Sequence, residues 1–250
     1  MTTAPTLPRL GVLGGMGPLA TVDFMRKLIL GTPGTRDQDH LPVIAYSVPQ
    51  IPDRSEAFLN GSDAPWPYLL EGLRTLEHAG AQAIAIPCNT AHVWHARLAM
   101  QSSTTILHIG RSACGQIAAR LPRGSRVGVL ATSATLAARI YHDELEAAGM
   151  TVVEPDAATQ REAVMRGIRA VKAGELAHGA ALLLDAARSL ERAGVAALLL
   201  ACTEIPLALA GAPLAVPTID PTAALAHACI AWWQRACAAG SSPNLSRSPT

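Results

Sequence analysis

Two segments of the sequence, AGAQAIAIPCNT at residues 79–90 and AGVAALLLACTE at residues 193–204, follow one pattern. Each begins with an Ala-Gly pair, continues as an apolar run and ends in a cysteine with a threonine close behind it. A second pair, RLGVL at 9–13 and RVGVL at 126–130, precedes them: Gly11 lies 77 positions before Cys88, and Gly128 lies 74 positions before Cys202. This repetition predicts two similar halves related by an internal duplication.

Apolar runs typical of buried strands alternate with stretches of helical periodicity through both halves. The expected strands are residues 10–13, 43–48, 83–86, 106–109, 126–130, 151–154 and 196–201. The expected helices are residues 19–30, 68–78, 91–100, 135–147, 160–171 and 175–192. This alternation predicts an α/β fold of two pseudo-symmetric domains, each a parallel-type sheet flanked by helices, with the active site in the cleft between them.

The two halves also suggest domain limits. We expect residues 1–104 together with 216–240 to form the first domain and residues 105–215 to form the second. The Ser- and Pro-rich end, residues 241–250, is typical of a disordered tail. The first ten residues lack the apolar region of a secretory signal, so none is expected.

The composition favours a protein that acts on a small molecule. Half of the 250 residues are hydrophobic and 16% are charged, and the formal net charge is +1. This balance provides no electrostatic attraction for nucleic acid or an anionic membrane, so neither is expected as a partner. The apolar runs at 81–86 and 195–201 are far shorter than the roughly 20 residues that span a bilayer.

The five cysteines are odd in number and have no regular spacing: Cys88, Cys114, Cys202, Cys229 and Cys237. This pattern predicts free thiols in a reducing cytoplasm rather than a disulfide framework. Because no C-x-x-C pair is present, we expect no structural zinc site. The three cysteines outside the repeat are expected to be inert, which is usual for buried thiols.

Cys88 and Cys202 each follow a strand-like run and precede a helix-like stretch. This places both thiols at strand carboxyl ends and helix N-termini, where ligands bind in open α/β sheets. The helix dipole there favours the thiolate and is expected to lower a cysteine pKa. Two opposed thiols suit the inversion of a stereocentre beside a carboxylate, because one face of the carbon needs a base and the other an acid.

Two other motifs resemble ligand sites, a nucleotide-binding turn and a metal-binding pair, but their spacing and surroundings favour structural roles. Residues 14–17, Gly-Gly-Met-Gly after a strand, do not have the G-x-G-x-x-G spacing of a nucleotide-binding turn, so a tight turn or a cradle for a substrate carboxylate is expected instead. His92 and His95 lie one turn apart, but no further ligand motif accompanies them. Helix packing or capping is therefore expected rather than a metal site.

Seven motifs, in order along residues 10–231, resemble the aspartate/glutamate racemase family, and specifically its aspartate racemase branch. They are Leu13–Thr21 (LGGMGPLAT), Arg36–His40 (RDQDH), Pro49–Arg54 (PQIPDR), Pro87–His92 (PCNTAH), Met165–Ile168 (MRGI), Val171–Gly174 (VKAG) and Cys202–Glu204 (CTE). The two cysteine motifs define the superfamily, and the Met-Gly-Pro and Pro-Asp-Arg segments narrow the resemblance to the branch.

The resemblance implies a homodimer without pyridoxal phosphate or metal that interconverts L- and D-aspartate, with Cys88 and Cys202 as the acid/base pair. Arg54 and Lys172 match the cations that hold the substrate carboxylates in the family. Arginine suits a planar carboxylate, and two cations suit a dicarboxylic amino acid. The remaining candidate substrate-binding residues are Met16, Asn89, Thr90 and Thr203.

The sequence departs from the glutamate racemase branch, which carries an Asp-Ser motif where this chain has Gly14-Gly15-Met16 and a histidine where it has Glu204. These differences argue against a peptidoglycan-type glutamate racemase but leave glutamate and other amino acids open as substrates. The alternatives are another cysteine-dependent member of the superfamily, of the maleate isomerase or hydantoin racemase type, and a non-catalytic amino-acid-binding protein.

Overall fold

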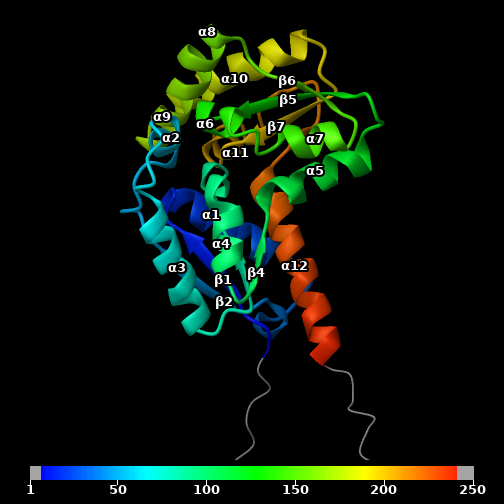
Figure 1. Cartoon of the computed structure of the whole chain (residues 1–250). Coiled ribbons are helices and arrows are strands. Elements are labelled where there is room, and N and C mark those ends of the chain that lie inside the picture. The colour runs from blue at the N-terminus through cyan, green and yellow to red at the C-terminus, as the bar shows by residue number, and fades with distance from the viewer. Residues whose placement is uncertain (1–6, 241–250) are drawn as a thin grey trace, which may run out of the picture.

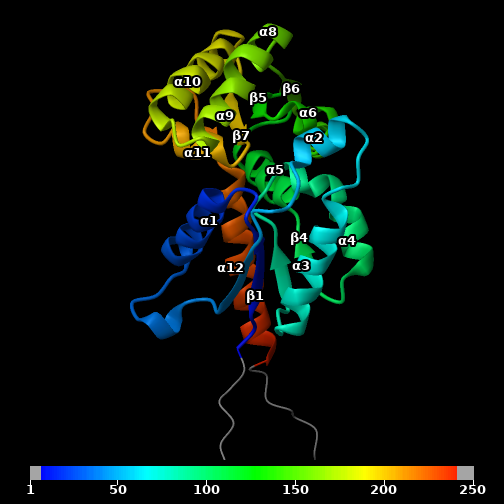
Figure 2. The same ribbon diagram turned by 90° about the vertical axis from the view of Figure 1, so that its left-hand side faces the viewer.

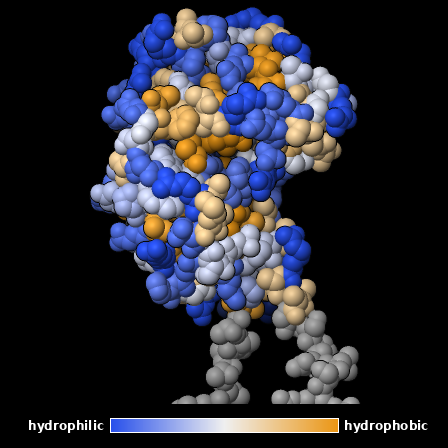
Figure 3. Space-filling model, viewed as in Figure 1, coloured by the Kyte–Doolittle hydropathy of each residue, from blue (hydrophilic) through white to orange (hydrophobic). Residues whose placement is uncertain are grey.

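The computed structural model describes residues 7–240, so the tail predicted at 241–250 lies outside the described residues. The chain forms two lobes, one above the other in Figure 1, each built on its own parallel sheet. On the face seen in Figure 3, hydrophobic residues gather in the upper lobe and at the junction of the lobes, among hydrophilic residues. The predicted fold of two pseudo-symmetric α/β domains is confirmed.

The first sheet has the order β2-β1-β3-β4, and all three pairings are parallel. Its strands are β1 Leu10–Gly14, β2 Val43–Ser47, β3 Ala83–Ala85 and β4 Thr105–Leu107. Central β1 is buried along its whole length. Gly11 lies opposite Ile44 on one side and Ile84 on the other.

The second sheet repeats this arrangement as β6-β5-β7-β8, again fully parallel. Its strands are β5 Arg126–Ala131, β6 Thr151–Val153, β7 Ala197–Ala201 and β8 Thr218–Ile219. Because β1 matches β5 and β3 matches β7, the two cysteines follow equivalent strands. The duplication inferred from the sequence is therefore reproduced in the strand order.

Helices cover both sheets (Figures 1 and 2). The first lobe contains α1 Pro18–Gly31, a 3₁₀ turn at Asp37–Asp39, α2 Arg54–Leu59, α3 Trp66–His78, a 3₁₀ turn at Thr90–Trp94 and α4 His95–Gln101. Next come α5 Ile109–Arg120, α6 Ser133–Ala137, α7 His142–Ala147, α8 Ala157–Thr159, a π-helical segment Gln160–Met165, α9 Arg166–Lys172, α10 Leu176–Arg192, α11 Glu204–Ala208 and α12 Pro221–Gly240. No helix within residues 7–240 has the length and apolarity of a membrane span.

The Ala-Gly pair of the repeat ends a helix in each half. After α3, Gly80 has φ +88°, its N–H donates to Glu77 O at 2.9 Å, and the N–H of Ala81 donates to Leu76 O at 3.0 Å. This is the Schellman arrangement, in which glycine supplies the left-handed residue. After α10, Gly194 has φ +75° and donates to Glu191 O at 2.9 Å. The repeated pair therefore turns the chain from the covering helix into the strand that carries the cysteine.

Several predicted elements differ from the structure. The helix expected at 160–171 begins as the π-helical segment Gln160–Met165 and becomes α-helical only in α9. The strand expected at 106–109 is β4, which ends at Leu107 because α5 already begins at Ile109. The helix expected at 135–147 is two helices, α6 and α7, separated by Arg139 with a left-handed φ of 54°. The helix expected at 91–100 begins as a 3₁₀ turn and becomes α-helical only from His95.

The last helix connects the two lobes. β8 pairs with β7 in the second sheet, whereas α12 packs against α1 and α5 and contributes Leu225, Cys229 and Ile230 to a core that contains residues of β1. Figure 1 shows α12 descending from the second lobe along the first. The domain limits at 104, 105 and 216 remain a prediction.

Equivalent glycines allow the covering helices to approach the two sheets. A Cβ at Gly11 would lie 3.3 Å from Leu76 Cβ of α3, and one at Gly128 would lie 3.1 Å from Leu190 Cδ1 of α10. The nearest atoms would be Ala81 Cβ at 2.9 Å and Leu198 Cδ2 at 2.8 Å. We expect Gly11→Ala and Gly128→Ala each to lower the free energy of unfolding by about 1–3 kcal/mol, the scale of overpacking a core.

Urea denaturation measures this loss. Gly115→Ala on the exposed face of α5 is the control, because a Cβ there meets nothing within 4 Å, so this change should be neutral or stabilising by up to about 1 kcal/mol. Unchanged midpoints for both core variants would contradict the packing argument.

Candidate active site

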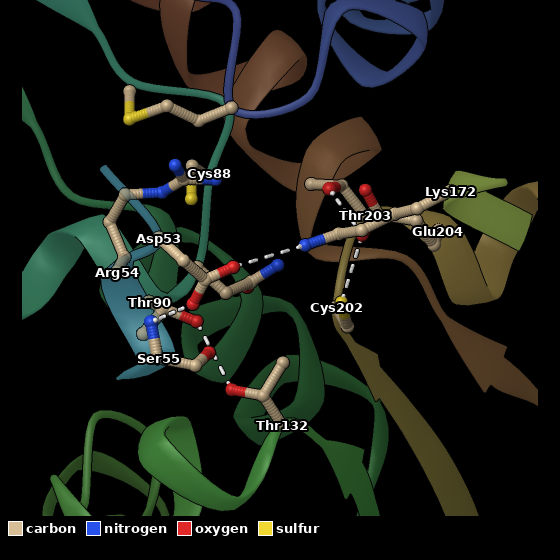
Figure 4. Close-up of a pocket in the computed structure, with 12 residues that line it drawn as sticks. Asp53, Arg54, Ser55, Cys88, Thr90, Thr132, Lys172, Cys202, Thr203 and Glu204 are labelled. Atoms are coloured by element: carbon tan, nitrogen blue, oxygen red, sulfur yellow. Dashed lines mark hydrogen bonds and ion pairs between the residues drawn. The ribbon is translucent and has the colours of Figure 1, made fainter. Parts of the chain in front are cut away.

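The two repeated cysteines lie on one enclosed cleft between the lobes. Cys88 follows β3 and is 5% exposed, and Cys202 follows β7 and is 6% exposed. Figure 4 shows them approaching the cleft from opposite sides. The cleft is lined by Met16, Asp53, Arg54, Ser55, Cys88, Asn89, Thr90, Thr132, Lys172, Cys202, Thr203 and Glu204. All eight residues selected from the sequence are among them.

The loop after Cys88 is fixed by side chains of the second lobe. The hydroxyl of Thr90 lies 3.1 Å from that of Thr132 and 2.9 Å from that of Thr135, and Tyr141 donates to Asn89 Oδ1. All of these groups are buried, and buried polar groups require partners. The contacts therefore hold the Cys88 loop of one lobe against the other lobe.

Asn89 retains a free donor. Its Oδ1 accepts from Tyr141, but its buried Nδ2 has no hydrogen-bond partner within residues 7–240. An unpaired buried N–H costs about 1–3 kcal/mol, so such a group usually marks a place for a ligand or an ordered water. Asn89 lines the cleft, where the free N–H is suited to a carboxylate oxygen.

Burial and Glu204 together favour the protonated thiol of Cys202. The thiol donates to Glu204 Oε2 at 3.0 Å, and Thr203 Oγ1 donates to the same oxygen at 3.1 Å. Burial raises the pKa of Cys202 well above its ordinary range, and the negative charge of Glu204 raises it further. The expectation that the helix N-terminus lowers the pKa of Cys202 is wrong, because burial and Glu204 outweigh the lowering effect of the Glu204 backbone N–H at the start of α11.

Arg54 is the first residue of α2, whose start is capped by Asp53 Oδ1, accepting from the N–H groups of Ser55 and Glu56. Its side chain is 9% exposed, and its Nη1 donates to the carbonyl oxygens of Ile51 and Pro52. Its buried Nε has no partner within residues 7–240. Nη1 thus anchors the guanidinium at the cleft, and the Nε–H, unpaired among the described residues, is free to donate a hydrogen bond to a ligand.

Lys172 reaches the cleft from the end of α9 on the second lobe. Its ammonium lies 4.0 Å from Asp53 Oδ2 of the first lobe (Figure 4). Burial opposes the charged form, but Glu204, Cys202, Cys88 and Asp53 outweigh it and raise the pKa of Lys172. The ammonium therefore stays protonated and supplies a fixed positive charge beside both thiols.

The sequence analysis did not identify four residues of the cleft as site residues: Asp53, Ser55, Thr132 and Glu204. Thr132 directly follows β5, so the rule that selected the two cysteines, a polar residue at a strand carboxyl end, could also have found it. Asp53 and Ser55 flank Arg54 at the start of α2. The sequence analysis noted Glu204 only as a difference from the glutamate racemase branch. In the structure, Glu204 accepts a hydrogen bond from Cys202 and raises the pKa of that thiol.

The histidines pack behind Cys88. His92 donates from Nδ1 to the carbonyl of Cys88 at 2.9 Å, and its Nε2 accepts the N–H of Ile109 at the start of α5. The capping interpretation is confirmed. Burial, with His108 and His95 nearby, holds the pKa of His92 well below its usual value, so the ring stays neutral. No group of three or more metal-binding side chains is present within residues 7–240.

The glycine-rich segment after β1 is a tight turn. Gly15 has φ +93°, and a Cβ there would lie 2.4 Å from the backbone of Val48. Glycine is required for both reasons, since L-residues rarely adopt this φ. The turn leaves Met16 3% exposed at the cleft.

The fold and the paired thiols define a two-lobed α/β protein with one cysteine from each lobe on a shared cleft. The model of the family "Asp/Glu/Hydantoin racemase" matches residues 13–229, and the chain belongs to this family. An aspartate racemase from Picrophilus torridus is 32% identical, covers 91% of this chain and 94% of its own, and superposes with a TM-score of 0.82.

Two further relatives show the range of the similarity. The broad specificity amino-acid racemase RacX of Bacillus subtilis is 28% identical over 230 residues, 88% of this chain and 96% of the relative. A glutamate racemase of Francisella tularensis, solved with D-glutamate, shares the fold with a TM-score of 0.68 at 15% identity and covers 97% of this chain and 85% of its own. The predicted resemblance to the aspartate racemase branch is confirmed.

The contact between Cys202 and Glu204 generates a prediction. Glu204→Gln removes the negative charge, so the pKa of Cys202 should fall and its thiolate fraction should rise at neutral pH. Because nucleophilicity falls with thiol pKa, the alkylation rate should increase about threefold for each unit of pKa lost. Iodoacetamide labelling followed by peptide mass spectrometry measures Cys202 separately from the other thiols.

Cys114 is the internal control in the same digest. Burial, with a contribution from Glu144, raises its pKa to about 12, and Glu204 is not among the causes. Its slow labelling should be the same in both proteins. Equal or slower labelling of Cys202 in the variant would show that Glu204 does not hold the thiol protonated.

Proposed function

We propose that this chain is a racemase that interconverts L- and D-aspartate without pyridoxal phosphate or a metal, using Cys88 and Cys202 as its two proton-transfer groups. The observation that carries the proposal is the placement of one thiol from each lobe at equivalent strand ends on a single buried cleft. A non-catalytic amino-acid-binding protein would not need both thiols, which argues against that alternative.

The reaction moves one proton in each of two steps. The thiolate of one cysteine takes the proton from Cα, and the electron pair left on carbon is delocalised into the carboxylate. The thiol of the other cysteine then gives its proton to the opposite face of the planar carbon and becomes a thiolate. The reverse reaction uses the same pair with exchanged roles.

The polar groups of the cleft provide positions for both carboxylates of aspartate. Arg54 and Lys172 supply the cations, and the free Nδ2 of Asn89 supplies a neutral donor beside the hydroxyls of Thr90 and Thr132. Positive charge near the carboxylate is also favourable when negative charge develops on it during proton removal. Met16 and Thr203 also line the cleft.

The closed cleft holds too little space for the substrate. Its volume is 20 Å³, enough for about one water molecule. Aspartate therefore requires the lobes to separate before it binds, and their closure afterwards excludes water from the carbanion-like intermediate. The homodimer implied by the family resemblance and the cytoplasmic location predicted from the cysteine pattern are part of the same proposal.

A chiral assay tests the function directly. Enantiopure L-aspartate is incubated with protein dialysed against EDTA, without added pyridoxal phosphate, and the products are separated by chiral chromatography. We expect equal amounts of both enantiomers at equilibrium, from either starting enantiomer. Activity that disappears on dialysis and returns only with a metal or with pyridoxal phosphate would contradict the mechanism; turnover of maleate or a hydantoin instead would favour the other superfamily members.

Replacing either thiol separates the two halves of the reaction. Cys88→Ser and Cys202→Ser keep the shape, but a hydroxyl is too weakly acidic to act as a base near neutral pH, so each variant should lose racemisation. The remaining thiolate can still remove the proton of the enantiomer that faces it and return a solvent proton to the same face. We expect residual deuterium exchange at Cα, with opposite enantiomer preferences in the two variants.

Nuclear magnetic resonance in deuterated water measures this exchange for each enantiomer. Cys114→Ser is the matched control, because that thiol lies outside the cleft and should leave both activities intact. The same enantiomer preference in both active-site variants, or near wild-type racemisation in either, would exclude the two-thiol mechanism.

A further inference from the structure

A second cavity adjoins the thiol cleft. It lies between the N-terminus of α1, the end of α9 and α11, and has a volume of about 280 Å³. Arg54, Lys172 and Glu204 line both spaces, so the two meet at the charged end of the cleft. The remaining lining residues are Gly15, Gly17, Pro18, Leu19, Ala20, Pro49, Val171, Gly174 and Leu207.

The walls of this cavity beyond the junction are apolar or lack side chains. Leu19, Val171 and Leu207 provide hydrocarbon surface. A Cβ added at Gly174 would meet nothing within 4 Å, and one at Gly17 would meet only Glu204 Oε1 at 3.7 Å. The space therefore suits an apolar group, which gains free energy by leaving water.

The charged groups at the junction disfavour a cationic side chain. The carboxylate of Glu204 accepts hydrogen bonds from Cys202 and Thr203, so it is already engaged. The other two charges are the cations Arg54 and Lys172, which repel an ammonium or guanidinium tail. The cations hold a carboxylate at the junction itself, so a side chain that extends past them into the apolar part must be uncharged there, because a charge buried without a partner is costly.

We propose that this cavity is a side-chain subsite, and that the enzyme racemises amino acids with unbranched, uncharged side chains longer than that of aspartate. This inference rests on the proposed function, because it needs the thiols to invert Cα. The cleft holds only about one water molecule until the lobes separate, whereas the adjoining cavity is already more than ten times larger. Methionine is the probe, since its four-atom side chain is flexible and apolar.

The first experiment compares enantiopure methionine with aspartate in the chiral assay. We expect methionine to be racemised with a kcat/KM within a hundredfold of that for aspartate. Turnover of aspartate with no detectable turnover of methionine would overturn the subsite and leave the proposed function standing. Turnover of neither amino acid would overturn both the subsite and the proposed function. Turnover of methionine alone would support the subsite and would identify methionine, in place of aspartate, as the preferred substrate.

The second experiment fills the cavity. Leu19 is 60% exposed at the start of α1, so Leu19→Trp can be accommodated without disturbing the core. We expect kcat/KM for methionine to fall at least tenfold more than kcat/KM for aspartate. Circular dichroism melts confirm that the variant is folded.

Val22→Trp is the matched control. Val22 lies one turn further along α1, is 65% exposed and does not line the cavity, so both substrates should be turned over as in the wild type. An equal loss for both substrates in Leu19→Trp would identify the cavity as an entry path and overturn the subsite. The same change in substrate ratio in Val22→Trp would also overturn it.

Discussion

The polar contacts between Asn89 and Thr90 of one lobe and Thr132, Thr135 and Tyr141 of the other determine how the two halves meet. These side chains are buried, so each must find a partner, and the partners lie across the cleft. Apolar packing alone would tolerate small sliding movements, whereas hydrogen bonds fix distance and direction. The opposed arrangement of the thiols depends on this constraint.

The two halves match in backbone but differ in the surroundings of their thiols. Cys202 donates to a buried carboxylate, whereas the loop of Cys88 carries an amide, Asn89, with an unpaired N–H. A racemase acts on two mirror-image substrates, yet its site is built from L-residues and cannot be a mirror image of itself. The duplication therefore provides equivalent backbone positions, and the side chains around them give each thiol different surroundings.

The sequence predicted the longer strands well, but it gave no range for the short strand β8 or for the long helices α5 and α12. Buried parallel strands are continuous apolar runs, so β1, β5 and β7 were found at nearly their observed limits. The break between α6 and α7 at Arg139 was missed, because a single left-handed residue leaves no periodic signal. The side-by-side placement of α12, α1 and α5 was equally hidden, since contacts between segments 100 or more residues apart have no local pattern.

The sequence by itself determined the fold class and the duplication, because the repeat places a cysteine after an equivalent strand in each half. With the family motifs it also predicted eight site residues, and the structure brings all eight to one cleft. Only the tertiary structure decided the raised pKa of Cys202, the unpaired N–H of Asn89, the entry of Thr132 into the site and the second cavity beside Arg54 and Lys172. The physical reason is that proton affinity and pocket shape depend on burial and on through-space distances. Those distances join residues of different lobes, and the order of residues along the chain does not contain them.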